Sequence, residues 1–415
     1  MSHVPAPRDR FSAWCGWVLA GVAALAPLIA WLGPLAFAPV MAVAGLLTLP
    51  AARITDEERP AALALLVILI WASGSMIWSP YHPGELEEAT ALKLVLMAGL
   101  FWALASAAAR AAPGSRIWSL RIFAWGMAGL GVVLLVEGLT GAGLYQALRS
   151  AMHDPIRHDL AAKNVAVGAF VLTIFWAPAA LAGARVGGAG WLALPMVAGL
   201  VVSSLVFGAD APLAALVIGL VAALAVWRWP TAAPRLLAAV AAVFFLLMPL
   251  LLAVLISGGH YEALEKAAPL SWAQRMGYWR HAVTWIADHP LRGWGLDASR
   301  MFAPGIQLHP HDAALQMWLE LGVIGAMAAT VFWVVVFLRM SRPKPDAAMA
   351  ASAASAVAFL VFAAVSFGVW QEWWIAVGGF SAALCTALSR QPALGRSAPR
   401  DAIGARASTI GPFSE

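Results

Sequence analysis

The stretch LQMWLELGVIGAMAATVFWVVVFL, residues 315–338, decides the class of fold. Its only charged residue is Glu320. A helix needs about 20 mostly apolar residues to cross a bilayer, and this stretch meets that length. The sequence therefore predicts a membrane-spanning helix here.

Eleven further apolar runs flank this one, so we predict an all-α bundle of about twelve spans. We expect residues 1–390 to form a single transmembrane domain, and the tail 391–415, rich in Ala, Ser, Pro and Gly, to be disordered. The predicted spans, of which the second and the last are short, are 11–32, 34–50, 61–79, 91–108, 117–140, 164–183, 190–207, 211–227, 236–256, 315–338, 347–367 and 373–389.

The composition agrees with a membrane protein. Apolar residues make up 62% of the 415 residues, and the mean hydropathy is +0.81. Charged residues make up 11%, against about 25% in soluble domains. This excludes a soluble enzyme, a disordered chain and a nucleic-acid binder. The two cysteines, Cys15 and Cys385, lie in apolar runs and cannot form a disulfide framework or a metal site.

The distribution of Lys and Arg predicts the orientation of the chain. With the N-terminus inside, 9 of the 26 Lys and Arg residues fall in outer segments, and the inner segments hold the rest. Both termini are therefore expected in the cytoplasm. Eight of the nine histidines, all except His3, fall outside, so we expect the polar chemistry there. The outer basic residues are Lys93, Arg149, Arg157, Lys163, Lys266, Arg275, Arg280, Arg292 and Arg300.

The longest outer loop, 257–314, contains an amphipathic helix. We expect this helix to begin after Ser271 as its N-cap and to end near His289, because a residue before proline disfavours helix. It is expected to lie along the membrane surface. Its apolar face would carry Trp272, Met276, Trp279, Val283 and Ile286.

Two motifs of this loop resemble the O-antigen ligase and O-antigen polymerase family. They are RMGYWRHAVTWIADHPLRGWG at 275–295 and HPHDAALQMWLELGVIG at 309–325. The segments WSPYHPGE at 78–85 and RHDLAAKN at 157–164 also look like outer loops of that family. Two departures stand out. Asp312 replaces the usual Asn, and GADAP at 208–212 has Asp210 and no arginine where many members carry a Ser-Arg pair.

The resemblance implies transfer of an O-antigen or similar glycan from a polyprenyl diphosphate donor to a sugar hydroxyl, on the periplasmic side of the cell inner membrane. The acceptor would be a lipid A–core sugar. Such a reaction needs a base at the hydroxyl and cations on the diphosphate, and requires no metal or other cofactor. His311 occupies the signature position and suits the base, since histidine is neutral at neutral pH. Asp312 or Asp297 could orient it.

Arginine suits the diphosphate because its planar fork binds phosphate oxygens in pairs. Arg275 is the first candidate by resemblance, followed by Arg157, Arg280 and Arg149. Asp312 and His309 complete the predicted substrate-binding set, although His309 precedes Pro310 and could serve only to shape the turn. Glu320 lies nine residues after His311, about 13 Å along a helix, so we expect a structural role for it.

Three alternatives remain open at this point. A polymerase would use the same donor with a second lipid-linked glycan as acceptor. A transporter of lipid-linked glycans would share the apolar composition but would line its path with charges on several spans. A structural scaffold would leave the outer histidines without a purpose.

Overall fold

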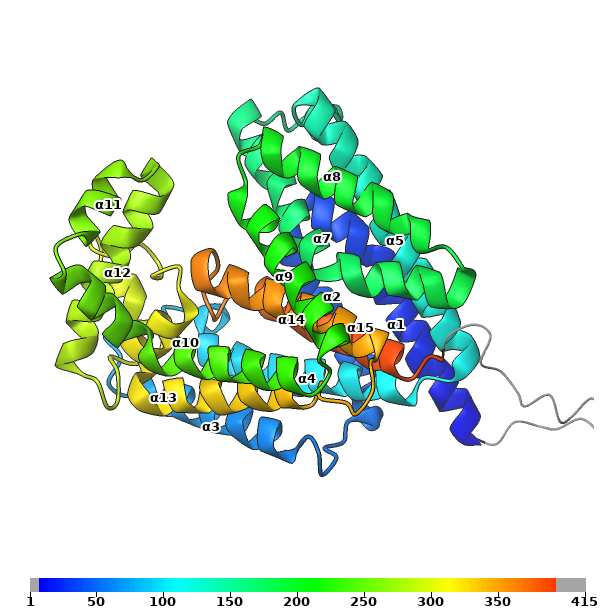
Figure 1. Ribbon diagram of the computed structural model, residues 1–415, viewed down its shortest axis with the longest axis horizontal. Coiled ribbons are helices and arrows are strands. Elements are labelled where there is room, and N and C mark those ends of the chain that lie inside the picture. The colour runs from blue at the N-terminus through cyan, green and yellow to red at the C-terminus, as the bar shows by residue number, and fades with distance from the viewer. Residues whose placement is uncertain (1–6, 393–415) are drawn as a thin grey trace, which may run out of the picture.

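The computed structural model describes residues 7–392, and within that range the chain is helical and has no strand. The predicted tail 391–415 therefore lies almost wholly outside the described residues. Figure 1 shows the arrangement. The helices are α1 (Pro7–Leu32), α2 (Phe37–Leu47), α3 (Arg59–Ser75), α4 (Thr90–Arg110), α5 (Pro113–Thr140), α6 (Gly143–Ala151), α7 (His158–Gly187), α8 (Ala193–Val206), α9 (Asp210–Arg228), α10 (Ala232–Ser257), α11 (Tyr261–Ala267), α12 (Leu270–Asp288), α13 (Ala313–Leu338), α14 (Ala347–Val365) and α15 (Glu372–Ser389), with short 3-10 turns at Pro34–Ala36, Leu49–Ala51, Leu86–Glu88, Gly190–Leu192 and Ala298–Met301.

Each predicted span coincides with a helix, but within residues 7–392 only eight helices are long and apolar enough to cross a bilayer by themselves. These are α1, α4, α5, α7, α9, α10, α13 and α14. The other four, α2, α3, α8 and α15, have 11, 17, 14 and 18 residues. At about 1.5 Å per residue, α2 covers roughly half of a 30 Å hydrocarbon core. The protein is a polytopic membrane helical bundle with eight candidate spans.

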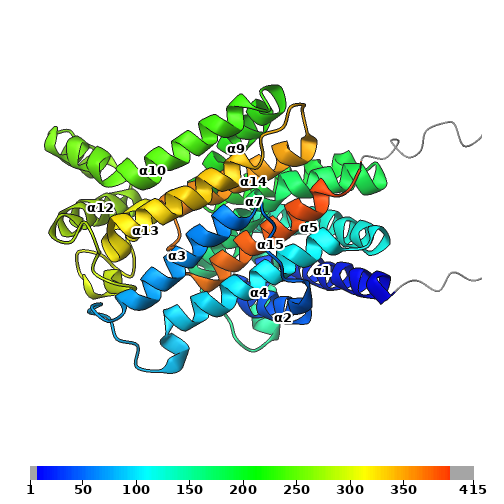
Figure 2. The same ribbon diagram turned by 90° about the horizontal axis from the view of Figure 1, so that it is seen from below.

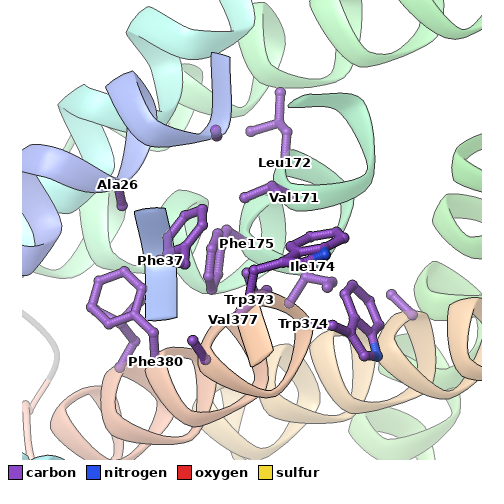
Figure 3. Close-up of a cluster of buried hydrophobic side chains, with 14 of the residues drawn as sticks. Ala26, Phe37, Val171, Leu172, Ile174, Phe175, Trp373, Trp374, Val377 and Phe380 are labelled. Carbon is purple, nitrogen blue, oxygen red and sulfur yellow. The ribbon is translucent and has the colours of Figure 1, made fainter. Parts of the chain in front are cut away.

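Small residues let the helices approach one another closely, as is typical of membrane bundles. A Cβ atom on Gly199 of α8 would collide with the Gly131 carbonyl oxygen of α5. Elsewhere the core is aromatic. Phe123, Phe175 and Phe380, from α5, α7 and α15, meet edge to face with ring centroids 5.5–6.0 Å apart. Figure 3 shows Phe175 and Phe380 in this cluster, with Phe37 of α2 beside them.

The loop helices lie at one end of the bundle. Figures 1 and 2 place α11 and α12 opposite the end where α1 begins and α15 finishes. The apolar stripe of α12 faces protein: Met276, Trp279, Val283 and Ile286 pack with Leu252 of α10 and with Leu315 and Leu319 of α13. The predicted N-cap is wrong. Pro269 is the N-cap, and Ser271 lies inside the helix. The predicted end is confirmed, because His289 is the C-cap before Pro290.

The contact between α5 and α8 gives a test of the packing. A Cβ on Gly131 would lie 2.6 Å from the Met196 Cα, whereas a Cβ on Gly129, half a turn away, would have nothing within 4 Å. We expect Gly131→Ala to reduce stability by about 1–3 kcal/mol, the usual cost of overpacking. Gly129→Ala is the matched control and should leave the thermal unfolding midpoint in detergent unchanged or slightly raised. Equal midpoints for the two variants would contradict this packing.

Candidate functional site

The site begins at a break in α13. Gly322 has φ 63° and ψ −160°, so the helical hydrogen-bond ladder is interrupted there. The freed groups bond to the loop that follows α12. Trp294 N donates to Leu319 O at 2.8 Å, Gly295 N to Glu320 O at 2.8 Å, and Val323 N to Pro290 O at 2.9 Å. The outer loop is thus joined to the membrane helix by main-chain bonds.

Glycine is required on both sides of the contact between the outer loop and the break in α13, which we call the junction. Gly293 and Gly322 both have positive φ, which disfavours side chains. A Cβ on Gly293 would lie 2.6 Å from Gly322 N, and a Cβ on Gly322 would lie 2.7 Å from Gly293 N. The glycines of RGWG and ELG are therefore explained by the close approach of two backbones.

Glu320 ties together three segments and is fully buried. One carboxylate oxygen accepts from Ser299 Oγ at 2.6 Å and from Gln316 Nε2 at 3.0 Å. The other accepts from Asp297 N at 2.8 Å and from Trp370 Nε1 at 2.6 Å. The carboxylate therefore connects the outer loop, α13 and the α14–α15 turn, in agreement with the structural role expected from its distance to His311.

His311 lies at the entrance of α13, with its ring only partly buried. Its Nδ1 is 2.7 Å from the carbonyl oxygen of Ser366, in the α14–α15 turn. A carbonyl only accepts hydrogen bonds, so a neutral His311 carries its proton on Nδ1 and has its lone pair on Nε2. Tyr278 of α12 stacks on the ring with centroids 6.1 Å apart. Burial lowers the pKa of His311. The hydrogen bond to Ser366 raises this pKa, and the positive charge of Arg275 lowers it further.

His309 supports the backbone of His311. Its Nδ1 accepts from His311 N at 3.2 Å, and its Nε2 lies 3.3 Å from the side-chain amide of Gln371. Burial lowers the pKa of His309 to about 3, with smaller effects from His311 and Arg300. His309 is therefore neutral at physiological pH, and its contacts are those of a residue that shapes the turn.

Asp312 is the N-cap of α13. Its Oδ1 accepts from Leu315 N at 2.8 Å, and its Oδ2 is buried without a partner among the described residues. Burial raises the pKa of Asp312 to about 7, only partly opposed by the backbone N–H groups of Leu315 and Ala314. Neither Asp312 nor Asp297 bonds to the His311 ring in the described part of the chain, where the Ser366 carbonyl takes the expected orienting position.

Arg275 lies on α12 one turn before Tyr278 and is half-buried. Its guanidinium lies 5.2 Å from the Trp272 ring centroid, and it forms no ion pair within residues 7–392. Burial lowers the pKa of Arg275. The next turn is fixed by Trp279, whose Nε1 donates to Pro310 O at 3.0 Å. α12 therefore holds an arginine that has no ion pair in residues 7–392 and is one turn from Tyr278, whose ring stacks on His311.

The other predicted arginines have different partners. Arg280 forms an ion pair with Glu265 of α11 and lies 5.9 Å from the Tyr261 ring centroid. Arg157 is exposed and binds Asp159 with two nitrogens, at 3.0 and 2.6 Å. Arg149 pairs with Asp154. No bond in the described residues joins these arginines to His311.

The α14–α15 turn was missed by the sequence analysis. It supplies Ser366, Trp370 and Gln371, which contact His311, Glu320 and His309. A Cβ on Gly368 would lie 2.9 Å from the His309 ring, so this turn packs closely on the histidines. The available signal was GVWQEWW at 368–374, a polar pair among tryptophans between two apolar runs.

Comparisons with known proteins show similarities in the central part of the chain. A family model described as "O-Antigen ligase" matches residues 197–330, which run from α8 to the middle of α13. Two curated proteins named "Putative polysaccharide ligase", from Rickettsia conorii and Rickettsia prowazekii, are each 28% identical over 122 and 123 residues, and one from Rickettsia bellii is 31% identical over 122.

Each of these similarities covers 26% of this chain. The chain spans 29–30% of the length of these curated relatives. No solved structure matches.

The cap at Asp312 gives a pH-dependent prediction. A carboxyl group whose pKa is higher in the folded than in the unfolded chain holds its proton more tightly when folded. Folded stability therefore falls as pH rises from about 4 to about 7. Asn keeps the capping oxygen without a charge. We expect Asp312→Asn to unfold at a higher temperature than wild type at pH 8, with the difference shrinking toward pH 4.

Asp312→Ala is the control for the cap. It removes the acceptor for Leu315 N and should cost about 1 kcal/mol, the usual value of an N-cap. An Asp312→Asn protein less stable than wild type at pH 8 would show that the carboxylate is stabilised by a partner outside residues 7–392.

Proposed function

We propose that the protein transfers a glycan from a polyprenyl diphosphate to a lipid A–core sugar, because residues 197–330 match the family model described as "O-Antigen ligase". The observation that carries this proposal is the bond between His311 Nδ1 and the Ser366 carbonyl. It leaves Nε2 of a neutral imidazole available as a base.

The reaction follows from these groups. The acceptor hydroxyl attacks the anomeric carbon of the donor, its proton moves to His311 Nε2, and the bond from that carbon to the diphosphate oxygen breaks. Arg275 binds the departing diphosphate, since its guanidinium has no carboxylate partner among the described residues and is one turn from the ring that stacks on His311. A positioned base contributes about 10²–10⁴-fold to such a step.

The topology supports a site on one side of the membrane. We place His311, α11 and α12 in the periplasm and both termini in the cytoplasm, with α2, α3, α8 and α15 completing an even set of twelve crossings. The observation behind this is that α1 begins and α15 finishes at the end of the bundle opposite α11 and α12 (Figure 2). The excess of Lys and Arg in the inner segments agrees.

The neutral state of His309 changes its proposed role. With its pKa lowered to about 3 it cannot bind phosphate as a cation, so we assign it to holding the His311 backbone. Arg280 and Arg157 are assigned to their carboxylate partners, Glu265 and Asp159.

The test is a surface-glycan gel from a strain that lacks the gene and is complemented with variants. We expect His311→Ala to give bare lipid A–core while polymer accumulates on the carrier lipid. Activity should fall by about 10²-fold or more, the contribution of a general base. Arg275→Ala should behave similarly, with partial recovery in Arg275→Lys, which keeps the charge without the fork.

His281→Ala is the matched control, because His281 is an exposed histidine of α12 stacked on Trp285. It should retain wild-type glycan. Core capped by a single repeat in the His311→Ala strain would identify a polymerase instead. A wild-type pattern in that strain would reject His311 as the base and favour the transporter.

A further inference from the structure

Arg300 is held in place by two neighbouring side chains, and the proposed reaction does not use it. Its Nε donates to Asp297 Oδ1 at 3.0 Å, and its guanidinium lies 5.5 Å from the Tyr81 ring centroid. Asp297 is buried, with 4% of its surface exposed, and its N–H is bound to Glu320. The arginine is therefore held by a carboxylate on one side and an aromatic ring on another.

The remaining nitrogens of Arg300 are free to bind a ligand. The side chain is 44% exposed, and neither terminal nitrogen has a partner among residues 7–392. A guanidinium fixed through Nε presents its two terminal nitrogens as a fork that matches the oxygens of a phosphate or carboxylate. Because Asp297 is anchored to Glu320, the direction of this fork is set by the same network that holds the histidine turn.

Arg300 and Arg275 act on different members of the histidine pair. Ser299 Oγ donates to Leu308 O at 2.9 Å, which puts Arg300 beside the His309 end of the turn. His309 and His311 follow, with ring centroids 4.2 Å apart, and Tyr278 of α12 stacks on His311. The positive charge of Arg300 lowers the pKa of His309, whereas that of Arg275 lowers the pKa of His311.

We propose that Arg300 and Tyr81 form a second anion-binding subsite, which receives a phosphate or carboxylate group of the saccharide substrates on the His309 side. This inference rests on the proposed glycan transfer. With Arg275 assigned to the leaving diphosphate, a second anion site near His309 suits a charged group on the acceptor sugar. Tyr81 adds a partly exposed ring on which a sugar can stack.

Arg292 provides a matched control in the same loop. It is exposed and lies 5.7 Å from the Trp78 ring centroid, as Arg300 lies over Tyr81, but no carboxylate pairs with it in the described residues. Arg292→Ala therefore removes the same charge from the same loop without disturbing Asp297.

The test is a transfer assay with full-length protein in nanodiscs. Initial rates are measured against the polyprenyl-diphosphate donor and against a core saccharide with and without its phosphate. For Arg300→Ala we expect KM for the phosphorylated acceptor to rise about tenfold, as expected for a charged hydrogen-bonded pair. Turnover at saturation, KM for the dephosphorylated acceptor and KM for the donor should not change. Arg300→Lys should be intermediate, and Arg292→Ala should match wild type.

The other outcomes are distinct. A rise in KM for the donor instead would support the subsite but assign the anion to the diphosphate. Unchanged KM values in Arg300→Ala and Arg300→Lys would overturn the proposal. If the wild-type protein transfers nothing, the proposed function fails, and the subsite is then decided by titrating inorganic phosphate and following tryptophan fluorescence. Weaker binding in Arg300→Ala than in Arg292→Ala supports it, and equal binding rejects it.

Discussion

The rest of the site depends on the main-chain junction between the outer loop and the break in α13. A membrane helix normally satisfies its own backbone, so an interruption at Gly322 must be compensated from elsewhere. The loop after α12 does this with the N–H groups of Trp294 and Gly295 and the carbonyl of Pro290. Only glycine at 293 and 322 allows the two backbones to approach so closely. The junction fixes the loop to the helix whose first turn follows His311.

Glu320 extends this constraint from the backbone to the side chains. Its four hydrogen bonds reach the loop, α13 and the α14–α15 turn, and loss of any buried partner would cost about 1–3 kcal/mol. The same turn carries the Ser366 carbonyl that fixes the tautomer of His311. A carboxylate inside a membrane helix, which by default suggests chemistry, thus holds together the segments around His311. Arg300 is attached to this support through Asp297, and Tyr278, one turn after Arg275, stacks on His311.

Local signals in the sequence predicted the helices well, because apolar runs and proline positions act over a few residues. Each predicted span is a helix, and α12 ends where Pro290 requires. In residues 7–392 eight helices are long and apolar enough to cross a bilayer by themselves, whereas α2 and α8, with 11 and 14 residues, are too short to do so. The motif around His311 led to the candidate site residues, whose roles stay predictions. The contacts of the turn at 366–371 could not be predicted from GVWQEWW alone, because the turn reaches the histidines only through the packing of α14 and α15. The role of Asp312 could not be predicted from its spacing either. Its position next to His311 suggested that it orients that ring, whereas its side chain accepts from Leu315 N and caps α13.

The most direct measurement is hydrogen–deuterium exchange of the outer loop in the wild-type protein. We expect the amides of Trp294, Gly295 and Val323 to exchange as slowly as those inside α13, because each is bonded across the junction. The exposed loop at 82–88 provides the fast reference in the same molecule. If the amides of residues 293–295 exchange as fast as those of the 82–88 loop, the main-chain bonds at the break in α13 do not hold the outer loop in place.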